Sequence, residues 1–291
     1  MKVAILYFSG TGNTEIVCKK WAEEAKKHDI ECDLFKFEEI QDKEIDLSDY
    51  DKVGIGYPIH AFNAPKFVLK SAKKIVKSKT IKPWFAIMVS GEYMNLNHSS
   101  HLKLKSILRK RFMFLDSEYH YIMPYNMIFR HTEKRAYDMY KTMNALVELD
   151  VNDYLVNNKS HALHKHKWAR PLIWAFRIEQ VYGPFYGKML HINKKKCIKC
   201  MKCVNSCPLH NIEYKDGKFK FKFKCTLCAR CSFNCPTNAF FCGFLQSWKV
   251  NGKYKFQEPK EVEVDKHPKY CKKSYERYYR EAEKRLGSVE K

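Results

Sequence analysis

Two copies of one cysteine pattern, 28 residues apart, constrain this chain more than any other feature of its sequence. Each copy has three cysteines at intervals of three residues and then a fourth that is followed by proline. The cysteines are Cys197, Cys200, Cys203 and Cys207 in the first copy, and Cys225, Cys228, Cys231 and Cys235 in the second. Such crowding in a chain that begins without a recognisable signal peptide favours metal ligation over disulfides.

The spacing within each copy indicates which metal group the cysteines bind. Three thiolates from one tight loop can bind three irons of a cubane, and the cysteine before proline reaches the other cluster. The sequence thus predicts two [4Fe-4S] clusters, one held by Cys197, Cys200, Cys203 and Cys235, the other by Cys225, Cys228, Cys231 and Cys207. Zinc ions or free thiols are the alternatives, but zinc sites are built from pairs of Cys-x-x-Cys units. The motif resembles that of bacterial-type two-cluster ferredoxins.

The first 156 residues alternate between strand-like and helix-like patterns. Short apolar runs predict strands at residues 3–8, 31–37, 52–57, 84–90 and 119–123. Helical patterns occupy residues 15–27, 65–76, 99–111 and 133–155. This alternation predicts an α/β fold with an open, doubly wound, five-stranded parallel sheet.

A loop rich in glycine and hydroxyl groups joins the first strand to the first helix. It consists of Ser9, Gly10, Thr11, Gly12, Asn13 and Thr14. Backbone N–H groups and hydroxyls at a helix N-terminus can bind an anion. No Gly-Lys-Ser/Thr sequence closes the loop as in a Walker A motif, and Glu15 takes the third glycine position of a dinucleotide fingerprint. A loop without lysine suits one terminal phosphate, and residues 7–14 resemble the flavodoxin loop that holds the phosphate of FMN.

The resemblance to flavodoxins points to two further loops. In a sheet of that strand order, the ligand lies beyond the carboxyl ends of the strands beside the switch point. The loops after the third and fourth strands are then expected to wall the flavin ring. Their residues are Pro58, Ile59, His60, Ala61, Phe62 and Asn63, and Ser90, Gly91, Glu92 and Tyr93. Ordinary loop packing is the alternative for His60, Phe62 and Tyr93.

The chain divides into four segments by composition. Residues 1–156 are expected to form the flavodoxin-like domain, 157–190 a connector, 191–245 a small α+β two-cluster domain, and 246–291 a basic C-terminal tail with a helix near 274–286. The connector offers a short helix from near Pro171 to Gly183-Pro184. It also contains His161, His164 and His166, which are expected to be a solvated cluster and, as the alternative, a metal site.

Together the two halves resemble the fused flavodoxin–ferredoxin proteins of anaerobes. The resemblance implies FMN, two [4Fe-4S] clusters and electron transfer between them and on to a partner redox protein. The alternative is an FMN-dependent reductase of a small-molecule substrate that is supplied with electrons by its own ferredoxin domain. No Ser-His-Asp arrangement or carboxylate pair suggests a hydrolase, and no catalytic residue is predicted.

The net charge of +22 arises from 54 Lys and Arg against 32 Asp and Glu. A nucleic-acid partner would favour arginine. Here, however, lysine outnumbers arginine 44 to 10 and is spread along the chain, so we expect no nucleic-acid binding. The charge should instead favour an acidic redox partner. The longest apolar runs, residues 3–8 and 85–89, are too short to span a membrane. A cytoplasmic protein without integral membrane association is therefore expected, and a homodimer is left open.

Overall fold

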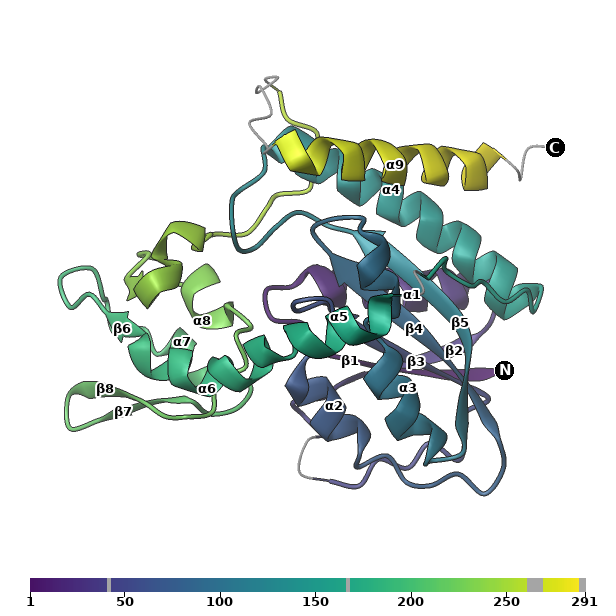
Figure 1. Cartoon of the computed structure of the whole chain (residues 1–291), viewed down its shortest axis with the longest axis horizontal. Coiled ribbons are helices and arrows are strands. Elements are labelled where there is room, and N and C mark those ends of the chain that lie inside the picture. Colours follow the sequence, from purple (N-terminus) through teal and green to yellow (C-terminus); the bar gives the residue numbers. More distant parts are fainter. Residues whose placement is uncertain (41–42, 166–167, 261–268, 288–291) are drawn as a thin grey trace.

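A five-stranded parallel sheet forms the larger part of the molecule (Figure 1). The computed structural model describes residues 1–40, 43–165, 168–260 and 269–287. The strands are β1 (Lys2–Tyr7), β2 (Glu31–Lys36), β3 (Lys52–Pro58), β4 (Lys82–Ser90) and β5 (Met113–Ile122). Their order is β2-β1-β3-β4-β5, with every neighbouring pair parallel. The predicted α/β fold class is confirmed, although β5 begins six residues before its predicted start at residue 119.

Helices cover both faces of this sheet. They are α1 (Asn13–Lys27), α2 (Lys66–Ala72), η1 (Asn95–Ser99), α3 (Leu102–Arg109), α4 (Glu133–Val151) and η2 (Asn152–Val156). Alternate residues of β1 point to opposite faces. Val3 and Ile5 pack with α1 and α4, whereas Ala4 and Leu6 pack with α2 and α3. The sheet is therefore buried on both sides, and this explains why its strands are almost continuously apolar.

The basic C-terminal segment contains a long helix that packs on the sheet domain. Helix α9 (Lys269–Gly287) lies beside α4 and packs on the flavodoxin-like domain (Figure 1). Its buried residues are Cys271, Tyr275, Tyr278 and Ala282, which recur at helical spacing and join the core of that domain. The helix expected near 274–286 lies within α9, and the apolar stripe that packs it on the sheet lies among the many charged residues of the segment.

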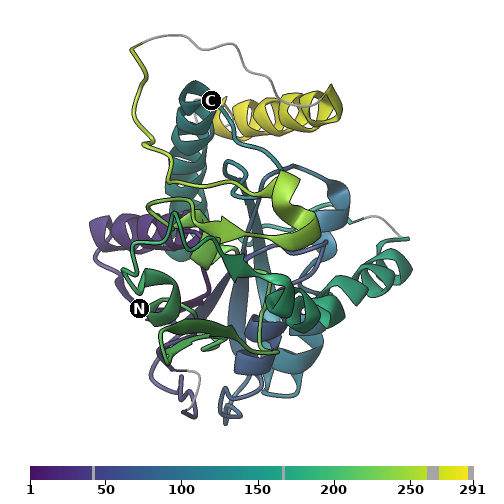
Figure 2. The same ribbon diagram turned by 90° about the vertical axis from the view of Figure 1, so that its left-hand side faces the viewer.

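A smaller lobe contains the cysteine motifs (Figure 2). Helix α5 (Ala169–Phe176) lies against η1 of the larger domain and leads into this lobe (Figure 1). The elements of the lobe are α6 (Ile178–Met189), β6 (His191–Ile192), α7 (Lys202–Asn205), β7 (Ile212–Lys215), β8 (Lys218–Phe221), α8 (Arg230–Phe233), β9 (Phe240–Phe241) and η3 (Gly243–Trp248). Strands β6 and β9 pair antiparallel, as do β7 and β8. The expected connector helix runs past Gly183-Pro184 to Met189, because Tyr186 and Leu190 are buried in the core of this lobe.

Residues 157–165 pack along the edge of β5. The Glu118 amide donates to the His161 carbonyl at 2.8 Å, and the His161 ring stacks on Tyr119. His98 Nδ1 lies 2.8 Å from the His164 carbonyl. His161 is thus half-buried against the sheet and not part of a solvated cluster, whereas His166 lies outside the described residues. Within the described ranges, no helix is long and apolar enough to cross a membrane.

Candidate cofactor sites

The eight cysteines of the doubled motif line two cavities, four to each. One cavity is lined by Cys197, Cys200, Cys203 and Cys235. The other is lined by Cys207, Cys225, Cys228 and Cys231. We call these the first and second cysteine sets. Each set combines three cysteines of one copy with the fourth cysteine of the other copy, and these are the two groups expected to share a cluster.

The backbone of the two copies repeats as closely as the sequence does. Four non-glycine residues adopt left-handed φ angles: Lys199 (52°) and Met201 (58°), and, 28 positions later, Leu227 (56°) and Ala229 (55°). Ordinary side chains rarely adopt this conformation. Each loop is therefore held in a strained shape that wraps the chain around its cavity.

Backbone amides point at the cysteine sulfurs in both sets. The amides of Asn211 and Ala239 lie 3.2 Å from the sulfurs of Cys207 and Cys235. The amides of Lys199 and Leu227 lie 3.4 Å from the sulfurs of Cys197 and Cys225 in the same way. Such N–H groups stabilise negative charge on sulfur and raise the reduction potential of a bound cluster.

Burial raises the pKa of four of these thiols, those of Cys203, Cys225, Cys228 and Cys231. It raises the pKa of Cys225 to about 12 and the pKa values of Cys203 and Cys228 to about 11. The neutral thiol is therefore the favoured form at neutral pH in the absence of metal. Thiolate ligands at these positions require the positive charge of bound iron, so metal binding should release protons.

The loop Ser9–Thr14 lies where β1 ends and α1 begins. Ser9 Oγ accepts a hydrogen bond from the Gly12 amide at 3.1 Å, and Gly12 has a φ of 113° that favours glycine. The amides of Thr11, Asn13, Thr14 and Glu15 donate to no acceptor among the described residues. Unpaired amides at a helix N-terminus fit the phosphate of FMN.

The loop after β3 forms a tight turn held by α5. His60 and Asn63 exchange two backbone hydrogen bonds of 2.9 Å around Ala61 and Phe62, both with positive φ. The Phe62 ring lies 4.9 Å from the ring of Phe176. Asn63 donates to the Ile173 carbonyl at 3.1 Å, and its side-chain oxygen accepts from Arg177. Phe62 is thus already in contact with α5, whereas Pro58, Ile59 and His60 lie at the end of the strand.

The loop after β4 is held against α9 through Tyr93. The ring of Tyr93 is buried and stacks on His120 at 5.3 Å, and its hydroxyl donates to Glu281 of α9 at 2.6 Å. Tyr93 is therefore packed against α9, as the alternative of ordinary loop packing describes. Ser90 bonds to His120 and to the Glu92 carbonyl.

Gly91 and Glu92 complete this loop. A Cβ at Gly91 would lie 2.5 Å from the Tyr125 ring, so glycine is required there. Glu92 is buried, and its Oε1 has no hydrogen-bond partner within the described part of the chain. Burial also lowers the pKa of His120, which keeps the imidazole beside Ser90 neutral.

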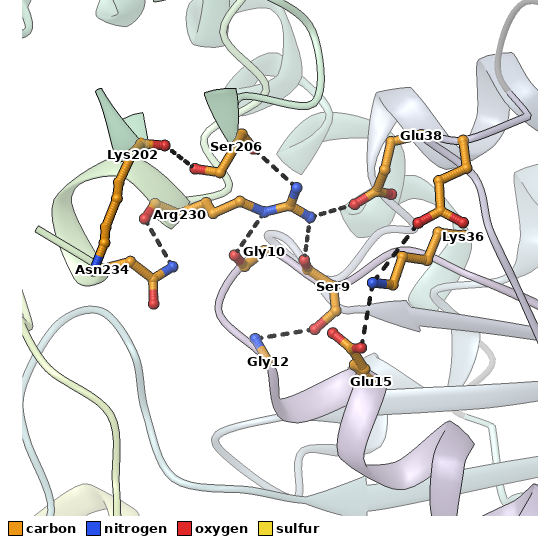
Figure 3. A network of polar contacts seen from close by, with 11 residues as sticks. Ser9, Gly10, Gly12, Glu15, Lys36, Glu38, Lys202, Ser206, Arg230 and Asn234 are labelled. Atoms are coloured by element: carbon orange, nitrogen blue, oxygen red, sulfur yellow. Dashed lines mark hydrogen bonds and ion pairs between the residues drawn. The ribbon is translucent and has the colours of Figure 1, made fainter. Parts of the chain in front are cut away.

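Arg230 connects the second cysteine set to the loop Ser9–Thr14, which we call the phosphate loop (Figure 3). Its guanidinium donates to the carbonyls of Gly10 at 3.1 Å and Ser9 at 2.6 Å, and it pairs with Glu38. It also donates to the carbonyl of Ser206, next to Cys207, at 2.9 Å. The sequence contained one signal for this role, because Arg230 is the single arginine among the lysines between residues 194 and 242.

Gly10 and Asn126 bring the two sites into direct contact. A Cβ at Gly10 would lie 2.3 Å from the Cys228 carbonyl, so only glycine allows this approach. Asn126 donates to the Thr11 hydroxyl, and it also lines the cavity of the second cysteine set. Asn126 was not among the predicted residues, although its position after β5 places it at the same sheet edge as the loop.

A cleft of about 420 Å³ separates the loop after β3 from the smaller lobe. Its lining includes His60, Lys66 and Lys70 on one side and Leu227 and Cys225 on the other. Burial lowers the pKa of His60 to about 4, so this ring is neutral at physiological pH. A residue of a predicted flavin loop and a cysteine of the second set therefore border the same space.

Replacing Thr14 with valine is expected to weaken FMN binding about tenfold or more, because a hydroxyl donor to a charged phosphate is lost while the side-chain shape is kept. Flavin fluorescence titration measures the change. Thr14→Ser, which keeps the hydroxyl, should bind FMN normally. Riboflavin has no phosphate, so its binding should not change in Thr14→Val. Equal FMN affinity in the two variants would show that Thr14 does not contact the phosphate.

Comparisons with known proteins agree with this division of the chain. Residues 4–105 match the family model of the flavodoxin domain, and residues 196–240 match that of the 4Fe-4S dicluster domain. No curated protein matches the chain. The matched residues support FMN and iron–sulfur clusters as the cofactors, and electron transfer as the activity.

Several solved structures resemble the N-terminal part. A short-chain flavodoxin associated with a non-canonical PDU bacterial microcompartment is 15% identical, with a TM-score of 0.36 over 55% of this chain and 99% of that chain. Megasphaera elsdenii flavodoxin is 18% identical, with a TM-score of 0.32 over 40% and 84%. An FMN-dependent NADH-azoreductase from Bacillus anthracis is 13% identical, with a TM-score of 0.36 over 52% and 98%.

The family matches and the observed sheet agree on the domain organisation of the chain. The flavodoxin match covers β1 to α3, and the dicluster match covers both cysteine motifs. The chain therefore contains a segment that matches a flavodoxin domain and, after it, a segment that matches a 4Fe-4S dicluster domain.

Proposed function

We propose that this protein passes electrons between two [4Fe-4S] clusters and FMN, and on to a partner redox protein. The observation that carries the proposal is the direct contact of the second cysteine set with the phosphate loop, where Cys228 meets Gly10. When bound, clusters carry single electrons, whereas FMN stores one or two and so links one-electron and two-electron partners.

The protein's own residues bind and position these groups. The two cysteine sets hold the clusters, and the amides directed at sulfur stabilise the negative charge that reduction adds. Arg230 fixes the second set against the carbonyls of Ser9 and Gly10. The amides of this loop are therefore available to bind the phosphate, while its carbonyls bind Arg230 of the smaller lobe.

The first cysteine set is the point at which we expect the partner protein to dock. Cys200 is exposed. Exposed lysines surround this set, namely Lys194, Lys195, Lys196, Lys199 and Lys202. Such a surface complements an acidic redox partner, and the association rate should fall as salt is added. The second set, which contacts the phosphate loop, is then the intermediate between the partner and FMN.

The test is anaerobic reduction of the full chain containing about eight irons and one FMN. After rapid reduction of the clusters, flavin absorbance should bleach at a rate that does not depend on protein concentration. Arg230→Ala should slow this step about tenfold or more, because it loosens the contact between the domains. Arg280→Ala, at an exposed position on α9, is the control. A flavin that is reduced only by added mediators would contradict the proposal.

The cleft beside His60 favours a second function, reduction of a small molecule at the flavin. It is about 420 Å³ in volume and is lined by lysines and by Cys225 of the second set. This size and these charges suit a small anionic acceptor. Steady turnover of such an acceptor, lost when the cleft is narrowed by Leu227→Trp, would favour the reductase over the carrier.

A further inference from the structure

We propose that the outward side of α6 docks on the surface of an anionic lipid bilayer, a property beyond the electron transfer proposed above. We call this surface the α6 face. It consists of Trp174, Ile178, Val181, Tyr182, Phe185, Met189 and Phe223, all large apolar side chains that are exposed. Trp174 is 74% exposed, Ile178 and Val181 60%, and Phe185 59%.

The α6 face is a continuous stripe and not a scatter of single residues. Ile178, Val181 and Phe185 follow one another at intervals of three and four, which places them on one side of α6, and Trp174 precedes them near the end of α5. The stripe continues onto the loop after β8, because the rings of Phe185 and Phe223 lie 5.8 Å apart. Large contiguous apolar patches of this kind mark interaction sites.

The helix cannot turn this side inward, because its inner side is already occupied. A Cβ at Gly183 would lie 2.9 Å from the Cys225 carbonyl, and one at Gly187 would lie 2.6 Å from the Cys225 side chain. Tyr186 and Leu190 are buried on the same inner side. The apolar stripe is therefore held on the exposed side of α6.

The charge around the α6 face fits an anionic surface. Residues 157–212 contain eleven Lys and Arg but only one acidic residue, Glu179. Arg170 and Lys188 are exposed and flank the stripe. Aromatic and aliphatic side chains on one side of a helix, bordered by basic residues, are typical of segments that lie in the membrane interface. Basic residues beside such segments bind anionic lipid headgroups.

Two other occupants fit this surface less well. A second copy of the chain, related by two-fold symmetry, would bring the same basic surroundings face to face and so add repulsion. The acidic residues of a protein partner would pair with the lysines, but they would not bury the large apolar side chains of the α6 face. Because Cys225 lies against the inner side of α6, docking on lipid places the second cysteine set close to the membrane.

Flotation of the full chain, reconstituted with its cofactors, tests the proposal. Vesicles of phosphatidylcholine with about one part in three of phosphatidylglycerol should carry the protein, whereas pure phosphatidylcholine vesicles should carry much less. The double variant Trp174→Glu, Phe185→Glu should bind the anionic vesicles at least about tenfold more weakly. Arg170→Gln and Lys188→Gln should each weaken binding about fivefold. Ile81→Glu, at a residue 73% exposed just before β4, is the matched control and should bind normally.

Flavin and cluster absorbance equal to those of the unmodified chain show that each variant is folded. The proposal is overturned if the unmodified chain does not float with the anionic vesicles, a result that needs no variant. It is also overturned if the double variant floats equally well. Dimers that depend on Trp174 in sedimentation experiments, without vesicle binding, would assign the α6 face to a second copy and overturn the lipid proposal.

Discussion

Replacing Cys235 with alanine is expected to remove the cluster of the first cysteine set and to leave the second cluster in place. Although Cys235 belongs to the second copy of the motif, it lines the cavity with Cys197, Cys200 and Cys203. Iron should fall from about eight to about four atoms per chain, because a cubane that lacks one of its cysteine ligands is lost. Iron analysis and the electron paramagnetic resonance spectrum of the reduced protein measure the change.

Cys207→Ala should give the opposite result, with the second cluster lost and the first retained. Cys242→Ala is the matched control, because Cys242 borders the second cavity but stands outside the motif. It should keep all of the iron. Loss of the second cluster in Cys235→Ala, or in the control, would contradict the assignment of ligands across the two copies.

Replacing Tyr278 with alanine is expected to lower the free energy of unfolding of the flavodoxin-like domain by about 3–5 kcal/mol, the cost of truncating a large buried aromatic side chain. Tyr278 is 2% exposed, and its ring lies 5.3 Å from that of Tyr93. Its hydroxyl also accepts a hydrogen bond from the Ile122 amide at 3.4 Å. Denaturant unfolding followed by far-ultraviolet circular dichroism gives the free energy.

Lys273→Ala on the same helix is the control for this prediction. Lys273 is exposed, so its removal should change the free energy of unfolding by no more than about 0.5 kcal/mol. Similar effects of the two substitutions would show that α9 does not contribute to the core and that the segment behaves as the basic tail expected from its composition.

Features that depend on neighbouring residues could be predicted from the sequence. The cysteine spacing within each copy, the apolar runs of the strands and the loop between β1 and α1 are all local patterns. Each requires only a few consecutive residues, and the physical rule behind it, such as the period of a strand or the position of amides at a helix start, acts over the same distance. These patterns established the α/β sheet and the two candidate cofactor sites.

Other features depend on contacts between distant parts of the chain, and these are visible in the folded structure alone. Arg230 meets the Ser9 carbonyl across 221 positions, and Tyr93 meets Glu281 across 188. No local pattern predicts which loop α9 will cover. That depends on how α9 and the smaller lobe pack on the folded sheet. The local patterns were enough to indicate FMN and iron–sulfur clusters as the cofactors. Long-range packing places the second cysteine set against the loop Ser9–Thr14 and Tyr93 against α9.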